Sequence, residues 1–351
     1  MLLAIESPPG GVAQWGASDV ILSAPADPDR TLYDPGLQQT KGSYPVLSLQ
    51  PPSKSRNNMT PFKSFAIAGI GSVGAPIAEE LLKQKAAGNA REVVLLTRSC
   101  TQSSNNKTLE RLASHGARVA EVDYTSEQSI ISVLHGVTVV ISTVSHMQLD
   151  IQPILATAAK KAGVRLFVPS EYGDPTDIAE TGVLKIKRDF HTKLRELDLP
   201  YLLTFTGPLT DFILVPYFHI DFEKGTATVG GDGNAVNSFT YIPDLARFIA
   251  YVLTHLTPEQ LYWKTLRIEG DRISFNEIFK QYTAKTGKKI TVSYQTLPEL
   301  EAALKANPYD VASFLSSEWA QGRGLVGKPE ELSNGLYPAW NPKKVIDVIT
   351  Q

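Results

Sequence analysis

Apolar runs alternate with amphipathic segments from residue 62 onward. Six apolar runs are predicted to be strands, at residues 65–68, 93–96, 119–122, 137–141, 166–168 and 201–203. Several of them are continuous, which is typical of parallel strands buried on both faces. Helices are expected between the strands, near residues 74–86, 105–115, 127–135, 148–162 and 183–197. Alternating strands and helices predict an α/β fold with a doubly wound parallel sheet.

The alternation weakens beyond residue 207. Two short strands are expected at residues 226–229 and 238–242, on either side of a Gly-rich turn. Asp150 and Asp244 are predicted to begin helices, the second of which ends near His255. The remaining helices are expected near residues 274–286, 297–306 and 342–350. We predict a smaller substrate-binding region over residues 208–351.

Residues 1–60 have a different composition from the rest of the chain. They are rich in proline and show no periodic apolar pattern, so we predict a disordered extension. Met59 stands directly before the first strand. Two interpretations remain open: Met59 is the natural start and the leader is an artefact of gene prediction, or the leader is a true flexible tail. N-terminal sequencing of the native protein distinguishes them.

Composition excludes several classes of function. The formal charge is −2, so no phosphate-neutralising nucleic-acid surface is expected. Cys100 is the single cysteine, which rules out an intrachain disulfide and a multi-cysteine metal site and fits a reducing compartment. No apolar stretch reaches the roughly 18 residues of a membrane span. We therefore expect a cytoplasmic protein with no metal, nucleic-acid or membrane partner.

A glycine-rich loop follows the first strand and opens a helix. It has the pattern G-x-G-x-x-G, with Gly69, Gly71, Ser72, Val73 and Gly74 as predicted cofactor-binding residues. Glycines permit a tight turn and a close approach of the backbone to a pyrophosphate, and the helix N-terminus offers free N–H groups. A purely structural Gly-rich turn is the alternative. The context predicts an NAD(P)-binding Rossmann domain over residues 61–207.

The end of the second strand indicates which dinucleotide is bound. NAD-preferring sites carry an acidic residue about 20 residues after the loop, where it binds the ribose 2′-hydroxyl. Here Arg98 occupies the end of the strand, and Lys107 follows on the next helix. A guanidinium can bind a 2′-phosphate through forked hydrogen bonds, so we predict NADP(H). The alternative is an ordinary solvent-facing arginine.

Several blocks of sequence resemble a known family. Residues 139–149 and 166–173, with 231–234 and 241–244 as later blocks, are similar to isoflavone-reductase-like proteins of the NmrA-like family. These are atypical short-chain dehydrogenases, and the resemblance spans roughly residues 63–255. Their loop is typically G-x-x-G-x-x-G, whereas this chain has Ala68 at the first position. The resemblance implies that Ser142, Thr143 and Val144 belong to the cofactor site at the end of the fourth strand.

The same resemblance implies a catalytic lysine. Short-chain dehydrogenases use Tyr-x-x-x-Lys, but Val183 occupies the tyrosine position here. The family likewise lacks the tyrosine and retains the lysine, which corresponds to Lys187. By resemblance, Lys187 contacts the nicotinamide ribose and acts as a general acid or base. Its pKa, ordinarily about 10.4, would then have to be lowered by burial or by a neighbouring cation. A solvated Lys-rich helix face is the alternative.

Four further residues are candidates for substrate binding: His146, Tyr172, Phe212 and Tyr217. The alternative for each is pocket lining without proton transfer, or plain core packing. The preferred function is an NADPH-dependent reductase that delivers hydride to an enone or benzylic carbon of a small apolar or aromatic substrate. A non-catalytic NADP(H) redox sensor and an extended, epimerase-like dehydrogenase are the alternatives. A homodimer is the default expectation for the assembly.

Overall fold

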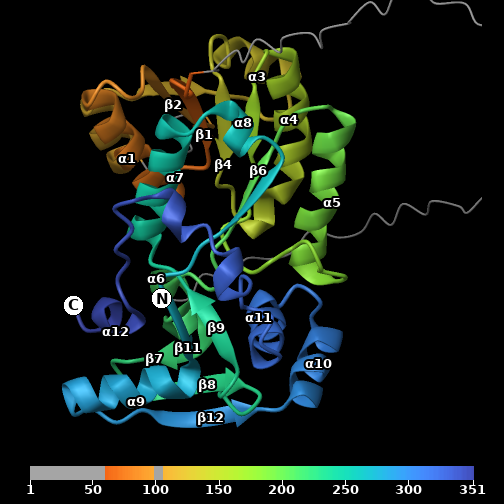
Figure 1. The fold of residues 1–351 in the computed structure, drawn as a ribbon. Coiled ribbons are helices and arrows are strands. Elements are labelled where there is room, and N and C mark those ends of the chain that lie inside the picture. Colours follow the sequence, from red (N-terminus) through yellow and green to blue (C-terminus); the bar gives the residue numbers. More distant parts are fainter. Residues whose placement is uncertain (1–59, 99–105) are drawn as a thin grey trace, which may run out of the picture. The chain divides into compact units, whose positions relative to one another are not determined.

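The computed structural model describes residues 60–98 and 106–351 (Figure 1). The predicted disorder of residues 1–59 and the single cysteine, Cys100, lie outside this part of the chain. Every helix within the described ranges falls short of the length or apolar character that a bilayer crossing demands.

The central feature is a parallel five-stranded sheet with the order β3-β2-β1-β4-β5. Its strands are β1 (Ser64–Ala68), β2 (Glu92–Thr97), β3 (Arg118–Glu121), β4 (Val139–Ser142) and β5 (Leu166–Val168). An isolated parallel bridge from Phe167 to Tyr201 places β6 (Leu202–Phe205) beside β5. β6 in turn pairs in parallel with β10 (Lys264–Arg267). The prediction of a doubly wound parallel sheet is confirmed.

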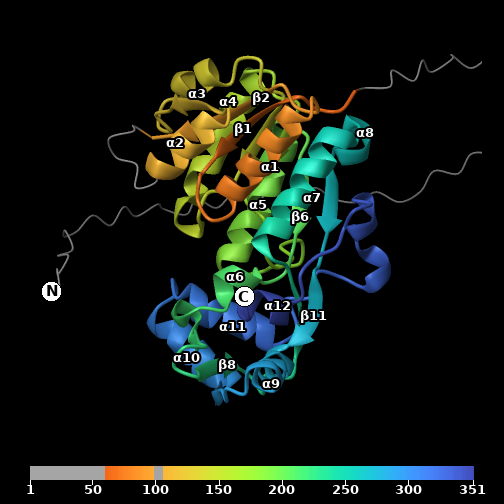
Figure 2. The same cartoon turned by 90° about the vertical axis from the view of Figure 1, so that its left-hand side faces the viewer.

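Helices cover both faces of this sheet (Figures 1 and 2). They are α1 (Gly74–Ala86), α2 (Asn106–Ser114), α3 (Glu127–Val133), α4 (Gln152–Lys161) and α5 (Gly182–Glu196). Successive residues of β1 point to opposite faces, as a strand requires. Phe65 and Ile67 belong to one buried cluster, together with α1 and α2, whereas Ala66 and Ala68 belong to another, together with α3, α4 and α5. The side chains on both faces of β1 are therefore buried.

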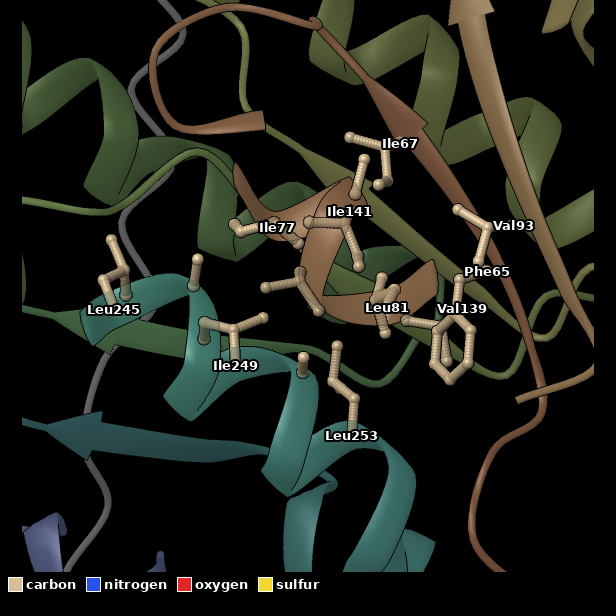
Figure 3. Close-up of a cluster of buried hydrophobic side chains, with 14 of the residues drawn as sticks. Phe65, Ile67, Ile77, Leu81, Val93, Val139, Ile141, Leu245, Ile249 and Leu253 are labelled. Carbon is tan, nitrogen blue, oxygen red and sulfur yellow. The ribbon is translucent and has the colours of Figure 1, made fainter. Parts of the chain in front are cut away.

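Helix α7 (Ile242–His255) comes from the C-terminal part of the chain but packs against α1. Leu245, Ile249 and Leu253 recur every four residues and so lie on one side of the helix. Figure 3 shows them beside Ile77 and Leu81 of α1, in the cluster that also contains the β1 side chains. The predicted domain boundary at residue 207 stays a prediction. Helix α7 and strand β10 come from beyond this boundary and complete the layers around the sheet.

The remaining C-terminal elements form a second group (Figure 1). Strands β7 (Ile220–Asp221), β8 (Thr226–Gly230) and β12 (Thr291–Gln295) make one small sheet, and β9 (Val236–Phe239) pairs with β11 (Asp271–Ser274). Its helices are α6 (Thr210–Ile213), α9 (Phe275–Thr286), α10 (Leu297–Ala306), α11 (Val311–Ala320) and α12 (Val345–Ile349). Helix α8 (Pro258–Leu261) instead follows α7, and its Leu261 belongs to the buried cluster around α1. Short 3-10 helices occur in both parts of the chain: η2 (His146–Ile151) directly before α4, and η3 (Pro216–Phe218), η4 (Pro329–Glu331) and η5 (Asn334–Leu336) in the C-terminal part. The two predicted strands thus exist but belong to different sheets.

Two predicted helix starts are wrong. Asp150 lies inside η2, and α4 begins only at Gln152, with a proline in its first turn. Asp244 lies in the first turn of α7, after the N-cap residue Tyr241. Its carboxylate accepts the backbone N–H of Lys343 at 2.7 Å and pairs with Arg247 of the same helix, so it does not cap the helix end.

Candidate functional site

A large cavity opens where the parallel strands end. Its volume is about 1080 Å³, at the upper end of the range usual for small-molecule sites. The segments that follow β1, β2, β3, β4 and β5 all contribute to its lining, and α5, α6 and α11 complete it. Ligands of open α/β sheets bind at this edge, so the cavity is the candidate site.

Two glycines hold the loop after β1 against β4. Gly69 has φ +94°, and a Cβ there would lie 2.8 Å from the carbonyl oxygen of Thr143. A Cβ on Gly74 would lie 2.0 Å from the carbonyl oxygen of Gly69. The hydroxyl of Thr143 donates to that same carbonyl. These residues therefore set the close packing of loop, helix and strand.

Gly71 differs from the other two glycines. A Cβ there would meet no atom within 4 Å, and the residue lines the cavity. Its bare backbone faces open space, as the approach of a pyrophosphate requires. Helix α1 begins beside it with no side-chain cap and with no acidic residue in its first turn. The positive end of the helix is thus left for an anion.

Most of the predicted cofactor residues come together around the cavity. Those that line it are Gly69, Gly71, Ser72, Val73, Arg98, Thr143, Val144 and Lys187. Gly74 and Ser142 are buried behind the wall, and Lys107 is exposed on α2, outside the lining. Gly74 and Ser142 can therefore shape the cavity wall from behind. Lys107 does not contribute to the wall.

The segment after β3 adds residues that sequence reasoning missed. Tyr124 lines the cavity and donates its hydroxyl to the carbonyl of Leu96 at 3.3 Å. Burial raises the pKa of this phenol, and the nearby positive charge of Arg98 opposes that rise. Asp123 accepts the backbone N–H of Thr125 at 2.9 Å, and hydrogen bonds from Thr125 lower its pKa. Their place directly after the predicted strand at residues 119–122 was the available signal.

Lys187 projects from α5 into the cavity wall. Its Nζ donates to the backbone carbonyl of Glu171 at 3.1 Å. Burial lowers the pKa of Lys187, while the negative charges of Glu171 and Asp174 work against that change. Lys185, one of the nearby cations in the sequence, is engaged with Asp189 instead. The direction of the shift is the one that general acid–base chemistry requires, and its cause is burial.

A buried carboxylate fixes the segment that holds Lys187. Glu171 is 1% exposed, and its Oε1 lies 2.7 Å from Nε2 of His191. Its other oxygen accepts the hydroxyl of Thr176 at 2.9 Å. His191 stands one turn after Lys187 on α5. His191 and Lys187 thus both bind Glu171: His191 contacts its carboxylate, and Lys187 contacts its backbone carbonyl.

All four predicted substrate residues line the cavity, which brings together His146, Tyr172, Phe212 and Tyr217. Tyr172 is buried, and within the described ranges its hydroxyl has no hydrogen-bond partner. Burial raises its pKa. Burial also lowers the pKa of His146, and the charge of Lys187 adds to that effect. Phe212 and Tyr217 are largely exposed, so they are not plain core residues.

Helix α11 supplies a wall that the sequence analysis did not anticipate. Val311, Leu315 and Trp319 lie along one side of it and line the cavity. The indole Nε1 of Trp319 donates to Oδ2 of the buried Asp174 at 2.9 Å. Burial raises the pKa of Asp174 to about 7. Asp310, whose carboxylate accepts the backbone N–H of Ser313, was the sequence signal for this helix.

Comparison with known proteins identifies the family of this chain. Residues 65–322 match the profile of the NmrA-like family, and the chain belongs to that family. The chain is 26% identical over 273 residues to an isoflavone reductase homologue of Arabidopsis thaliana, a match that covers 72% of this chain and 84% of the relative. It is 28% identical to a phenylcoumaran benzylic ether reductase of Pyrus communis, over 69% and 82% of the two chains. The resemblance drawn from the sequence is confirmed.

Solved structures support the fold. The leucoanthocyanidin reductase of Vitis vinifera in complex with NADPH superposes with a TM-score of 0.72 at 21% identity, over 82% of this chain and 98% of that one. An isoflavone reductase gives a TM-score of 0.71 at 19% identity, over 83% and 99%. An NADPH-dependent quinone oxidoreductase of Escherichia coli gives 0.65 at 21% identity, over 82% and 98%. The structural neighbours are therefore Rossmann-type reductases, among them NADPH complexes.

Proposed function

We propose that this protein is an NADPH-dependent reductase that transfers hydride to an enone or benzylic carbon of a small apolar or aromatic substrate. One observation carries the proposal: a single cavity joins the glycine loop and Arg98 to Lys187 and an aromatic wall. A dinucleotide and a second molecule would meet there beside a lysine. Two relatives, named as an isoflavone reductase homologue and a phenylcoumaran benzylic ether reductase, support the same reaction class.

The residues present suit a phosphorylated dinucleotide. The open side of Gly71 and the uncapped start of α1 would receive the pyrophosphate. Arg98 is exposed at the cavity edge, where its guanidinium would pair with a 2′-phosphate. Lys187 would contact the nicotinamide ribose from α5. Because Lys107 lies outside the lining, we assign recognition of the 2′-phosphate to Arg98 alone.

The chain's own contribution is positioning and proton handling. NADPH, when bound, supplies the hydride. Lys187 holds a proton at Nζ, and its lowered pKa brings the neutral amine closer to physiological pH, so it can give or take a proton at the substrate. Val183 lines the cavity in the position of the missing tyrosine. The apolar side chains of α11 and the Phe212 segment exclude water from the reacting carbon.

Parallel titrations test the proposal. Intrinsic fluorescence is followed as NADPH, NADP⁺, NADH and NAD⁺ are added, and NADPH oxidation is then monitored with benzylideneacetone, menadione and a benzylic aryl ether. We expect selective binding of NADPH and oxidation with at least one acceptor. Preference for the oxidised forms without turnover would favour a redox sensor. Binding of none of the four would make the glycine loop purely structural and end the proposal.

A further inference from the structure

Asp174 stands out among the residues around the cavity. It is 4% exposed and lines the cavity between the segment after β5 and helix α11. Its Oδ2 accepts the indole N–H of Trp319 at 2.9 Å. Its Oδ1 is buried and has no hydrogen-bond partner within residues 60–98 and 106–351. A buried polar atom without a partner is costly, and at a ligand cavity the ligand is the natural partner.

The charged neighbours of Asp174 come from two helices and its own segment. Lys187 of α5 favours the ionised carboxylate, and Glu318 of α11 disfavours it. Glu318 is engaged by Arg323, whose Nε donates to it at 2.7 Å. Glu171 is already held by His191 and Thr176. Burial is the largest influence and brings the pKa of Asp174 to about 7, so the acid and the carboxylate are both present near neutrality.

Trp319 determines which oxygen of the neutral acid carries the proton. An indole N–H can only donate, so Oδ2 must act as an acceptor. The proton of the neutral acid then resides on Oδ1, the oxygen without a protein partner. The protonated side chain of this cavity-lining residue thus carries its one O–H donor on the buried Oδ1, and the hydrogen bond from α11 fixes the orientation of the carboxyl group.

We propose that Asp174 is a catalytic residue that donates a hydrogen bond from Oδ1 to the carbonyl oxygen of a conjugated carbonyl substrate, an aryl enone or a quinone. This inference rests on the proposed function and narrows its substrate class. A carbonyl oxygen only accepts hydrogen bonds, which complements the neutral acid. Hydride addition at the conjugated carbon moves charge onto that oxygen, so the hydrogen bond strengthens as the reaction proceeds. Trp319 is a positioning residue for this donor.

The first test measures binding without turnover. Calorimetric titration with benzylideneacetone is run from about pH 5 to about pH 9, on either side of neutrality. We expect the wild-type affinity to fall by up to about tenfold per pH unit above neutrality, as the donor is lost. Asp174→Asn should bind with no such pH dependence, because its amide accepts from Trp319 and donates at every pH. Asp174→Leu should bind weakly throughout, and Asp189→Asn, an exposed carboxylate on α5, should behave as wild type.

The second test measures turnover of menadione with NADPH. Asp174→Leu should lose about 100- to 1,000-fold in kcat/KM, the usual cost of removing such a donor. Asp174→Asn should retain more activity than Asp174→Leu and lose the alkaline decline. Trp319→Phe should move the midpoint of that decline to higher pH, because the indole hydrogen bond lowers the pKa of Asp174.

The outcomes separate the two proposals. Wild-type binding that does not change with pH, or an Asp174→Asn profile identical to wild type, overturns the role of Asp174 and leaves the reductase standing. Absence of NADPH binding removes the reductase, and the calorimetric pH profile still decides whether Asp174 holds a carbonyl. If Asp174→Leu does not fold, the comparison of Asp174→Asn with wild type carries the decision.

Discussion

The two ends of the cavity are built in different ways. The glycine-loop end uses consecutive residues, 69–74, and depends on backbone shape and on the absence of Cβ atoms. The far end uses side chains from segments that are distant in the chain: Asp174 and Trp319 are 145 residues apart. A motif of adjacent residues can be read directly, whereas a contact between distant residues requires the fold. We therefore expect substitutions in the glycine loop to change the shape of the backbone. Substitutions of side chains at the far end should instead change hydrogen bonding and proton transfer.

The largest effect is expected where the two ends meet. Lys187→Ala should reduce kcat by about 100- to 10,000-fold, the usual contribution of a positioned acid or base. The fold should survive, because Lys187 is only partly buried and its Nζ donates to a backbone carbonyl. Steady-state kinetics and thermal melts measure both effects. Lys185→Ala on the same helix is the control and should keep near wild-type turnover. Unchanged turnover in Lys187→Ala would retire the residue as the acid or base.

The glycine loop offers a matched pair of variants. Gly74→Ala should destabilise the protein by about 3 kcal/mol, because overpacking against the Gly69 carbonyl forces the backbone to move. Gly71→Ala should leave stability within about 0.5 kcal/mol, because its Cβ meets nothing in the protein, and should weaken NADPH binding instead. Urea unfolding and NADPH titration distinguish these effects. Equal stability losses in the two variants would contradict the division between packing and ligand approach.

Asp174, at the far end of the cavity, should make the stability of the folded protein depend on pH. The pKa of Asp174 is raised from 3.8 to about 7 in the folded protein. The folded state therefore binds the extra proton, and the unfolding free energy contributed by this group falls as pH rises between these two values, by up to about 1.4 kcal/mol per unit. Asp174→Asn should remove this fall and be the more stable protein at alkaline pH. Denaturant midpoints across the pH range measure it, and parallel curves for the two proteins would contradict it.

The smallest expected effect lies at the outer edge of the glycine-loop end. Arg98→Ala should weaken NADPH binding by about tenfold, the loss of one charge-assisted contact at an exposed position. NADH binding should change little, because NADH carries no 2′-phosphate. Fluorescence titrations of both cofactors supply the ratio. Equal losses for the two would remove the claim that Arg98 recognises the phosphate.

Sequence reasoning was most successful for local features. The strands around the central sheet and the start of α1 could be predicted because each depends on a short apolar run or on adjacent glycines. Asp150 and Asp244 were predicted as helix starts from local preference alone. Asp150 lies inside η2 instead, and the carboxylate of Asp244 binds the backbone N–H of the distant Lys343. Helix α11 was missed, although Asp310 marks its start. The hydrogen bond from Trp319 to Asp174 could not be predicted, because nothing near Trp319 in the sequence reveals this partner.

The contact between Trp319 and Asp174 also couples the protonation of Asp174 to the packing of helix α11. Asp174 and Trp319 of α11 are both buried and are joined by a hydrogen bond. Any local opening that lifts α11 would hydrate the carboxyl, return its pKa towards the value of a free aspartate and release a proton to solvent at neutral pH. Exchange of the α11 amides should therefore quicken as pH rises through neutrality, in excess of the intrinsic chemical rate. The far wall of the cavity is held more firmly in acid than in alkali.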